Sequence, residues 1–291
     1  MKSQTLTLKA PAKINLFLKI VARRSDGYHE IETLMHKVAL FDVVRLAREG
    51  NSLALSCRGS KVPDGRENLA WKAAEAFFSV AGLDPAVRIE LEKNITVAAG
   101  LGGGSSDAAA VLLGLNRLFD AGLEQERLLG IGAGLGADVP FFLQEFGCAL
   151  ATGIGEKLEP MGHLGDCWVL LVNPGFAVST RWAYENFPLT STSNPYILAR
   201  GRITEEEFHG AAPRLVEELG NDLEAVTIAR FPEIGSIKKE LKKAGASAAL
   251  MSGSGPTVFG LFAGKEQAQH AFTQFAGLYG DSVFLVRPYI S

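Results

Sequence analysis

A glycine-rich segment, residues 98–110, has the composition of a phosphate-binding loop. It reads AAGLGGGSSDAAA and contains Gly100, Gly102, Gly103 and Gly104. Positions without a Cβ let backbone amides turn inward and approach an anion closely. We expect an alanine- and leucine-rich helix to begin directly afterwards, at Ser105 and Ser106, and to end near Gly122. Its first amides and its dipole would favour a triphosphate, and the two hydroxyls could reach a phosphate oxygen or a magnesium ion.

The same segment could instead be a flexible glycine linker, although linkers seldom adjoin a well-patterned helix. No GK[ST] sequence follows the glycines, so the segment is not a Walker A loop. Its setting also differs from that of a dinucleotide-binding GxGxxG motif. Asp107 is expected to favour the first helical turn electrostatically.

Two polar residues near the N-terminus, Lys13 and Asn15, point the same way from an expected strand, about 7 Å apart. Together they could bind a phosphate and a hydroxyl. The alternative is that they belong to the solvated face of a half-buried antiparallel strand, whose other face carries Ile14, Leu16, Leu18 and Ile20.

An aspartate, Asp138, stands between Gly136 and the Val139–Pro140 pair, where we expect the chain not to be helical on either side. A carboxylate held in this way is a candidate general base. It could equally be an Asx-turn residue that caps the next segment.

Two further segments have weaker signals. Residues 251–257, MSGSGPT, precede an expected strand and could form a second backbone nest for phosphate or substrate, or a tight turn. Tyr28 could stack on a flat ring and His29 could hydrogen-bond its edge, although both could be ordinary turn residues.

Composition excludes several classes of protein. The 291 residues carry a formal charge of −3, which leaves no basic excess for nucleic acid. The three cysteines match no metal or disulfide pattern, so a reducing cytoplasm is expected. No run of about eighteen apolar residues occurs, so we expect neither a membrane span nor export.

The elements that must position these residues follow from periodicity. Residues 13–20 and 31–46 are expected to form a strand pair with a turn near Ser25–Gly27. A helix should start at the cap Asn68 and stop at Gly82, and another should cover 125–135. Further strands are expected at 88–97 and 167–175, a helix at 181–187, and a polar low-order stretch at 189–195.

Taken together, PAKINLFLKI, GLGGGSSDAAA and MSGSGPTVF resemble the three motifs of the GHMP kinases. The resemblance extends over nearly the whole chain and includes DGYHEIETL and GADVPFFL. It implies ATP and Mg²⁺ as cosubstrates, and a cytidine diphosphate-linked methylerythritol of isoprenoid synthesis as the small-molecule acceptor. It is compatible with a monomer or a homodimer.

The resemblance also implies residue roles. Asp138 would accept the hydroxyl proton, and Lys13 would orient it and stabilise charge. Asn68 would lie on the adenine side, with Tyr28, His29 and Asn15 around the cytidine, followed by a substrate segment that contains Thr180 and Tyr184. The ATP-phosphate loop would comprise Thr96, Val97, Ala98, Ala99, Gly100, Leu101, Gly102, Gly103, Gly104, Ser105 and Ser106, with Ser106 as the candidate metal ligand.

The implied fold class is α/β (α+β) with two lobes. The N-terminal lobe, residues 1–160, would hold the ATP loop and a left-handed βαβ crossover, against the usual right-handed preference. The C-terminal lobe, residues 161–291, would be ferredoxin-like. At Ala98 and Ala99 some relatives carry glycine, which should matter only if these residues need a positive φ.

Overall fold

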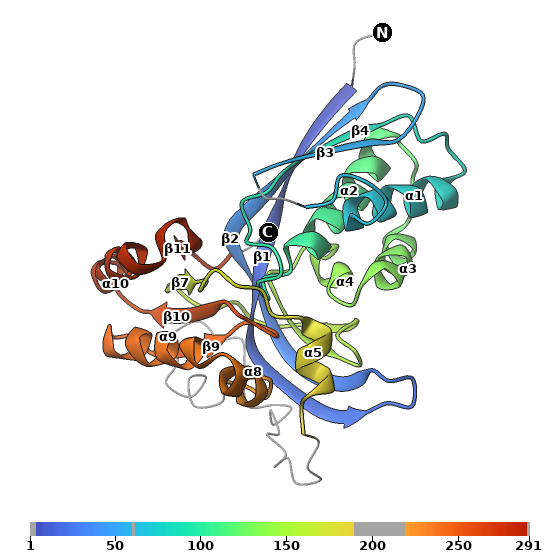
Figure 1. Cartoon of the computed structure of the whole chain (residues 1–291). Helices are drawn as coiled ribbons and strands as arrows, with labels where there is room; N and C mark the ends of the chain where they lie inside the picture. Colours follow the sequence, from blue (N-terminus) through green and yellow to red (C-terminus); the bar gives the residue numbers. More distant parts are fainter. Residues whose placement is uncertain (1–3, 60–61, 189–218, 290–291) are drawn as a thin grey trace. The chain divides into compact units, whose positions relative to one another are not determined.

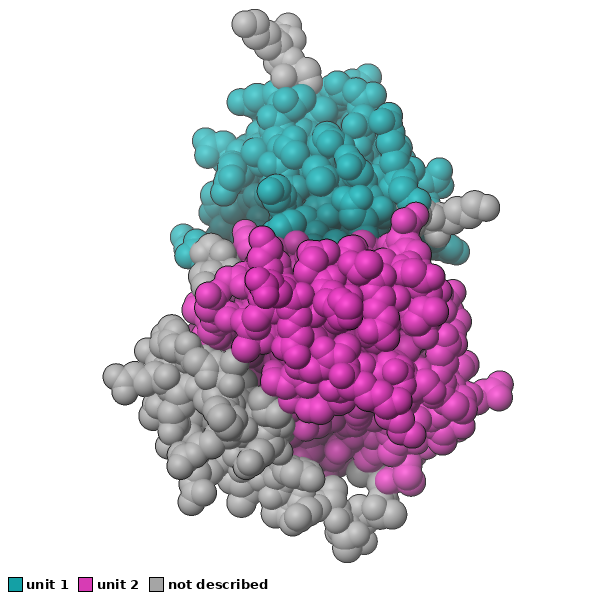
Figure 2. Space-filling model, turned by 90° about the vertical axis from the view of Figure 1, so that its left-hand side faces the viewer, with its two compact units in different colours: residues 1–12, 40–97, 102–145 teal, residues 13–39, 98–101, 146–291 magenta. Residues whose placement is uncertain are grey.

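Figure 1 shows the computed structural model, which describes residues 4–59, 62–188 and 219–289. The chain divides into two compact units (Figure 2). Unit 1 comprises residues 1–12, 40–97 and 102–145, and unit 2 comprises residues 13–39, 98–101 and 146–291. The polar stretch expected at 189–195 lies outside the described residues.

Eleven strands are described: β1 (Gln4–Arg23), β2 (His29–Arg48), β3 (Ala54–Arg58), β4 (Arg88–Glu92), β5 (Cys148–Thr152), β6 (Lys157–Pro160), β7 (Trp168–Val172), β8 (Gly220–Asn221), β9 (Ala248–Met251), β10 (Val258–Phe262) and β11 (Val283–Val286). One sheet has the order β3-β4-β2-β1-β8, with β5 paired to β2 and β6 paired to β5. The second sheet has the order β11-β7-β10-β9. The strand pair expected at 13–20 and 31–46 is confirmed, and both strands are longer than expected.

The described helices are α1 (Leu69–Ala81), α2 (Gly103–Leu118), α3 (Gln125–Leu135), α4 (Val139–Phe142), α5 (Thr180–Glu185), α8 (Glu224–Arg230), α9 (Pro232–Lys243), α10 (Lys265–Tyr279) and the 3₁₀ turn η1 (Gly280–Ser282). Within the described part of the chain, none of them is long and apolar enough to cross a lipid bilayer.

Unit 1 is built around a βαβ element in which the parallel strands β3 and β4 are joined by α1. The Asn68 side chain accepts a hydrogen bond from Ala70 N at 2.9 Å, and Gly82 ends α1 with a left-handed φ of 66°. Both expected caps of this helix are therefore confirmed. The apolar face of α1 is buried and packs against α2 and α3.

The helix after the glycine loop, α2, starts and stops earlier than expected. It begins at Gly103, two residues before Ser105, because Gly102 adopts a φ of 71° and fills the N-cap position. It ends at Leu118, and Asp120 has a φ of 48°. The Asn116 side chain donates to Leu123 O and accepts from Leu123 N, both at 2.9 Å. These bonds close a turn between α2 and α3, so Gly122 lies in the turn and does not end the helix.

Unit 2 contains the antiparallel sheet β11-β7-β10-β9, covered by α9 and α10. In the sequence, β7 precedes α9, which is followed by β9, β10, α10 and β11. This is the βαββαβ arrangement of a ferredoxin-like fold. The expected architecture of the C-terminal part is therefore confirmed.

A buried histidine of β2, His36, bonds to the backbone through both ring nitrogens. Nε2 accepts from Leu164 N at 3.1 Å, so Nδ1 carries the proton and donates to Lys37 O at 2.7 Å. Burial lowers the pKa of His36 to about 4. The imidazole is therefore neutral at pH 7 and fastens the 162–164 segment to β2.

The free energy of unfolding should fall by about 3 kcal/mol between pH 6.5 and pH 4, because the unfolded chain protonates His36 before the folded chain does. Urea titrations at several pH values measure this loss. Replacing His36 with glutamine should flatten the dependence, whereas replacing the exposed His270 with glutamine should leave it intact. If the free energy of unfolding of H36Q falls with pH as steeply as that of the parent protein, His36 is not the group responsible.

Candidate active site

Two polar residues of β1, Lys13 and Asn15, form the centre of a hydrogen-bonded group within unit 2. Lys13 Nζ donates to Asn15 Oδ1, and Asn15 Nδ2 donates to Thr33 Oγ1 at 2.8 Å. Lys13 and Asn15 are only 4% and 3% exposed, so the solvated-face alternative is wrong. The expectation of a half-buried strand is wrong for the same reason: residues 12–20 are buried on both faces.

The middle of the glycine loop, residues 98–101, packs directly on this strand. Lys13 N donates to Leu101 O at 2.9 Å, and Ser252 Oγ donates to Gly100 O at 2.8 Å. Gly100 has a φ of 77°, and a Cβ built on it would lie 2.1 Å from Ser252 O. Ala98 does adopt a positive φ, 52°, which the sequence left open. A flexible linker would not be held by such contacts.

Replacing Gly100 with alanine should therefore cost at least ~2 kcal/mol of stability, from the left-handed backbone and from the clash with Ser252 O. Gly104 is the matched control, because it is helical and a Cβ there meets nothing within 4 Å. G104A should be neutral or stabilising by up to ~1 kcal/mol. Thermal melts of the two variants measure the difference, and equal melting temperatures would contradict the loop geometry.

The C-terminal glycine turn, residues 251–257, closes on the same strand. It joins β9 to β10, a strand pair in which β9 was not expected. Asn15 N donates to Ser252 Oγ at 3.3 Å. A Cβ built on Gly253 would lie 3.2 Å from Asn15 Oδ1 and 3.3 Å from Lys13 Nζ. The turn is thus shaped around the lysine ammonium.

Three of the expected substrate residues, Thr180, His29 and Tyr184, take part in two contacting pairs within unit 2. Thr180, the first residue of α5, shares a hydrogen bond of 2.9 Å with Ser254 Oγ of the C-terminal turn. The rings of His29 and Tyr184 lie 5.4 Å apart with an interplanar angle of 30°. Burial and the nearby Arg23 lower the pKa of His29, so its ring is neutral at pH 7. Tyr28, another residue of this group, is 61% exposed.

The two ends of the glycine loop belong to unit 1. Thr96 and Val97 precede residues 98–101, and Gly102–Ser106 follow them. The Ser106 side chain is buried, and its Oγ has no hydrogen-bond partner among the described residues. An orphaned hydroxyl at the end of the first turn of a helix that follows a glycine loop fits an oxygen ligand for a cation or a phosphate.

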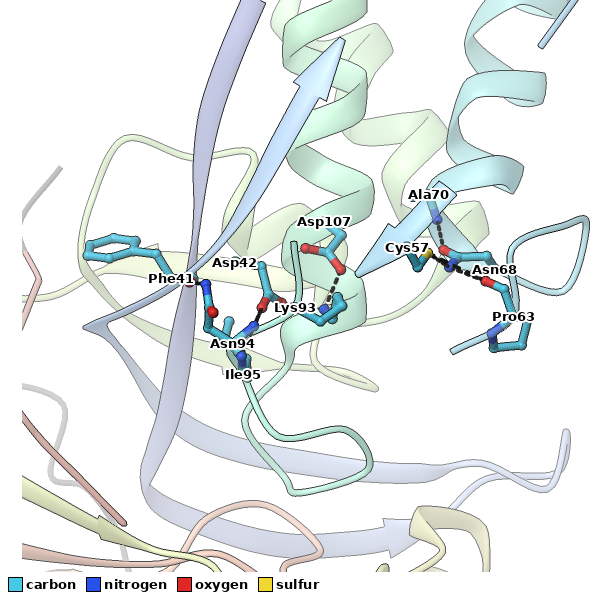
Figure 3. Close-up of polar contacts among 10 residues, drawn as sticks. All are labelled: Phe41, Asp42, Cys57, Pro63, Asn68, Ala70, Lys93, Asn94, Ile95 and Asp107. Atoms are coloured by element: carbon cyan, nitrogen blue, oxygen red, sulfur yellow. Dashed lines mark hydrogen bonds and ion pairs between the residues drawn. The ribbon is translucent and has the colours of Figure 1, made fainter. Parts of the chain in front are cut away.

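Asn68 has a structural task in unit 1 (Figure 3). Besides capping α1, its Nδ2 donates to Pro63 O at 2.7 Å and lies 3.7 Å from Cys57 Sγ. The side chain therefore holds the segment before α1 against β3. An adenine contact through this side chain stays a prediction.

Asp138 lies just before α4 with helical dihedrals, φ −82° and ψ −14°. The expectation of a non-helical chain is confirmed before Asp138, where α3 has ended at Leu135. After Asp138 it is wrong, because Pro140 falls in the first turn of α4, where its missing N–H costs nothing. In the described structure the carboxylate does not cap α4. A Cβ built on nearby Gly136 would lie 4.0 Å from Ser105 Oγ, which places this segment beside the start of α2.

A buried charge cluster supports the ends of the glycine loop in unit 1 (Figure 3). Lys93 pairs with Asp42 of β2 and, at 2.5 Å, with Asp107 of α2. Asp42 Oδ1 also accepts from Asn94 N at 2.6 Å and from Ile95 N at 2.8 Å. Asp107 is therefore buried in an ion-paired cluster beyond the first turn of α2, and the helix-dipole role expected for it is wrong.

Sequence reasoning missed several of these residues. Thr33 carries no local signal. Ser252 lies in the segment 251–257 that the sequence singled out, but its side-chain contacts could not be predicted, because they come from distant parts of the chain. Asp42 did carry one: a single carboxylate interrupts the apolar run from Val38 to Val44, and a charge inside a buried strand requires partners.

Comparison with known proteins identifies the class. The model of the GHMP kinases N terminal domain matches residues 68–145, and the model of the GHMP kinases C terminal domain matches residues 205–280. The chain belongs to the GHMP kinases, as the motifs indicated. A curated relative from Syntrophotalea carbinolica, named 4-diphosphocytidyl-2-C-methyl-D-erythritol kinase, is 48% identical over 96% of this chain and 97% of its own length. One from Geobacter metallireducens with the same name is 48% identical over 92% and 93%.

Solved structures agree with this classification. A crystal structure of 4-(cytidine 5'-diphospho)-2C-methyl-D-erythritol kinase superposes with a TM-score of 0.77, 35% identity and coverage of 97% of this chain and 98% of the other. A homoserine kinase from Cytophaga hutchinsonii has a TM-score of 0.75 at 19% identity, with coverage of 100% and 96%, and supports the fold alone.

Proposed function

We propose that this chain is an ATP-dependent kinase that phosphorylates the 2-hydroxyl of 4-diphosphocytidyl-2-C-methyl-D-erythritol in the non-mevalonate pathway of isoprenoid synthesis. The observation that carries this proposal is the 48% identity over nearly the full length of relatives with that activity in their name. The γ-phosphoryl group would move to the substrate oxygen, leaving ADP, the 2-phosphate and one proton.

Each unit has features of its own that would suit the phosphates of ATP. Gly100 and Gly253 sit where a Cβ would clash or crowd, and Ser106 Oγ is buried without a described partner. We assign residues 96–106 to the triphosphate. The described residues contain no group of three His, Cys, Asp or Glu side chains able to hold a metal. Ser106, whose Oγ is buried without a described partner, would hold Mg²⁺ together with phosphate oxygens and water, and the ion would neutralise phosphate charge.

Phosphoryl transfer requires mainly positioning and charge stabilisation, because its transition state is loose. Lys13 would stabilise charge on the transferred group, since it is buried, oriented by Asn15 and adjacent to Gly253. Asp138, whose carboxylate does not cap α4, would accept the proton of the attacking hydroxyl.

The cytidine moiety would be recognised by Tyr28, His29, Thr180 and Tyr184, with Asn15 nearby. The His29–Tyr184 ring pair supports this assignment, because a neutral imidazole can bond a base edge while the phenol ring offers a stacking surface. A lobe boundary near residue 160, the hand of the βαβ crossover, a monomeric or homodimeric state and a cytoplasmic location also stay predictions.

The test is ADP release by the purified protein with ATP and Mg²⁺ and one acceptor at a time. The acceptors are the cytidylated substrate, free methylerythritol, homoserine and mevalonate. ADP release is expected with the cytidylated substrate and with none of the other three. Faster transfer to one of the other acceptors would leave the kinase class intact and overturn the substrate.

A further inference from the structure

A short segment of unit 2, Asn221–Glu224, ties β1 to the C-terminal glycine turn. It starts at the last residue of β8, which pairs with β1 in parallel at Phe17 and Leu18. Asp222 N donates to Leu18 O at 2.9 Å, and Asp222 Oδ2 accepts from Ile20 N at 2.8 Å. One side of the segment is thus fixed to the strand that carries Lys13 and Asn15.

The other side of the segment holds the turn. Asn221 Nδ2 donates to Met251 O at 2.8 Å and to Gly253 O at 2.7 Å, while its Oδ1 accepts from Leu223 N at 3.0 Å. Glu224 Oε1 accepts from Met251 N at 2.8 Å, and its other oxygen pairs with Lys238. Asn221 is 8% exposed, and both of its amide protons are used on carbonyls two residues apart.

These bonds determine how the turn faces the ammonium group. Gly253 has a φ of 56° and lies beside Lys13 Nζ and Asn15 Oδ1. A peptide group is planar and trans, so its carbonyl and the next amide point in opposite directions. With Gly253 O held by Asn221, the Ser254 N–H must point away from Asn221.

We propose that Asn221 is a positioning residue for phosphoryl transfer: it sets the Gly253–Ser254 peptide and, through it, the place of Lys13. The residue acts without touching either substrate. This inference rests on the proposed function, because it assigns Lys13 and the turn to the transfer step. Since Lys13 would act in the transition state, loss of Asn221 should lower kcat more than it raises either KM.

The test compares N221A with N116A, a matched change in which an asparagine that also fastens a turn, at Leu123, is removed from unit 1. Both variants should lower the melting temperature by about 2–6 °C. N221A should lower kcat roughly 30-fold with both KM values within about threefold of the parent protein. N116A should keep kcat within about twofold.

A kcat within about twofold of the parent for folded N221A would overturn the positioning role. If N221A does not fold, the isosteric Asn221→Asp, which turns the donor into an acceptor facing two carbonyls, is measured in the same way with the same criteria.

Hydrogen exchange supplies a readout independent of turnover. The amides of residues 252–255 should exchange about tenfold faster in N221A than in the parent protein, and at the parent rate in N116A. Equal exchange rates in the two variants would overturn the inference. A parent protein inactive on every acceptor would instead refute the proposed function, and exchange alone would then decide whether Asn221 holds the turn.

Discussion

Replacing Asp138 with asparagine is expected to lower kcat at least ~100-fold while leaving the affinity for ATP nearly intact. The amide keeps the size and shape of the side chain but cannot accept the hydroxyl proton. Because the carboxylate does not cap α4, its replacement removes no capping hydrogen bond from that helix. Single-turnover kinetics with saturating cytidylated substrate measure the chemical step, and equilibrium titration measures nucleotide binding.

The matched control for this variant is Asp84→Asn, at an exposed aspartate in the loop before β4. It should retain the parent rate. Unchanged turnover in D138N would refute the assignment of Asp138 as the base. If a fall in ATP affinity accounts for the whole loss of turnover, Asp138 would instead be a nucleotide-binding residue.

Replacement by asparagine should affect stability differently at the two carboxylates around Lys93. Asp42→Asn should cost about 3–5 kcal/mol of stability, because it removes one of the two carboxylate partners of a buried ammonium. It also weakens the acceptor shared by Asn94 N and Ile95 N, at the entrance to the glycine loop. Denaturant titration at pH 7 measures the loss.

Asp107→Asn should leave the free energy of unfolding nearly unchanged at pH 7. Burial raises the pKa of Asp107 to about 7 despite the pull of Lys93, and Asp107 Oδ1 has no partner among the described residues. The unfolded chain ionises this carboxyl near its ordinary pKa, so the folded chain loses stability as pH rises from about 4 to 7. The free energy of unfolding of D107N should therefore rise relative to that of the parent protein as the pH is raised over that range. Equal losses in D42N and D107N would contradict the division of roles.

Some of this structure could be predicted because its signals are local. The N-cap Asn68, the apolar face of α1 and the C-cap Gly82 all lie within one short stretch, and each specifies the same helix. The glycine loop and the helix after it also adjoin in sequence. Even there the start of α2 depended on Gly102, whose left-handed φ no periodicity reveals.

The environment of Lys13 and Asn15 could not be predicted, because it is built from distant parts of the chain. Ser252 is 237 positions from Asn15, and Thr33 reaches it from the neighbouring strand. The alternation of residues 13–20 indicated one buried face, whereas loop 98–101 and the turn at 252–255 bury the other. Motif resemblance brought these segments together where pattern reasoning could not, and it still offered no role for Asn221 or Asp42.

The most direct test of the central claim is the position of the transferred phosphate. After reaction of 4-diphosphocytidyl-2-C-methyl-D-erythritol with ATP and Mg²⁺, proton-coupled ³¹P spectra of the product should show a new monophosphate without three-bond coupling to any carbon-bound proton, because C2 carries a methyl group and no hydrogen. A new phosphate split by neighbouring CH or CH₂ protons, or no new phosphate on this substrate, would contradict the account.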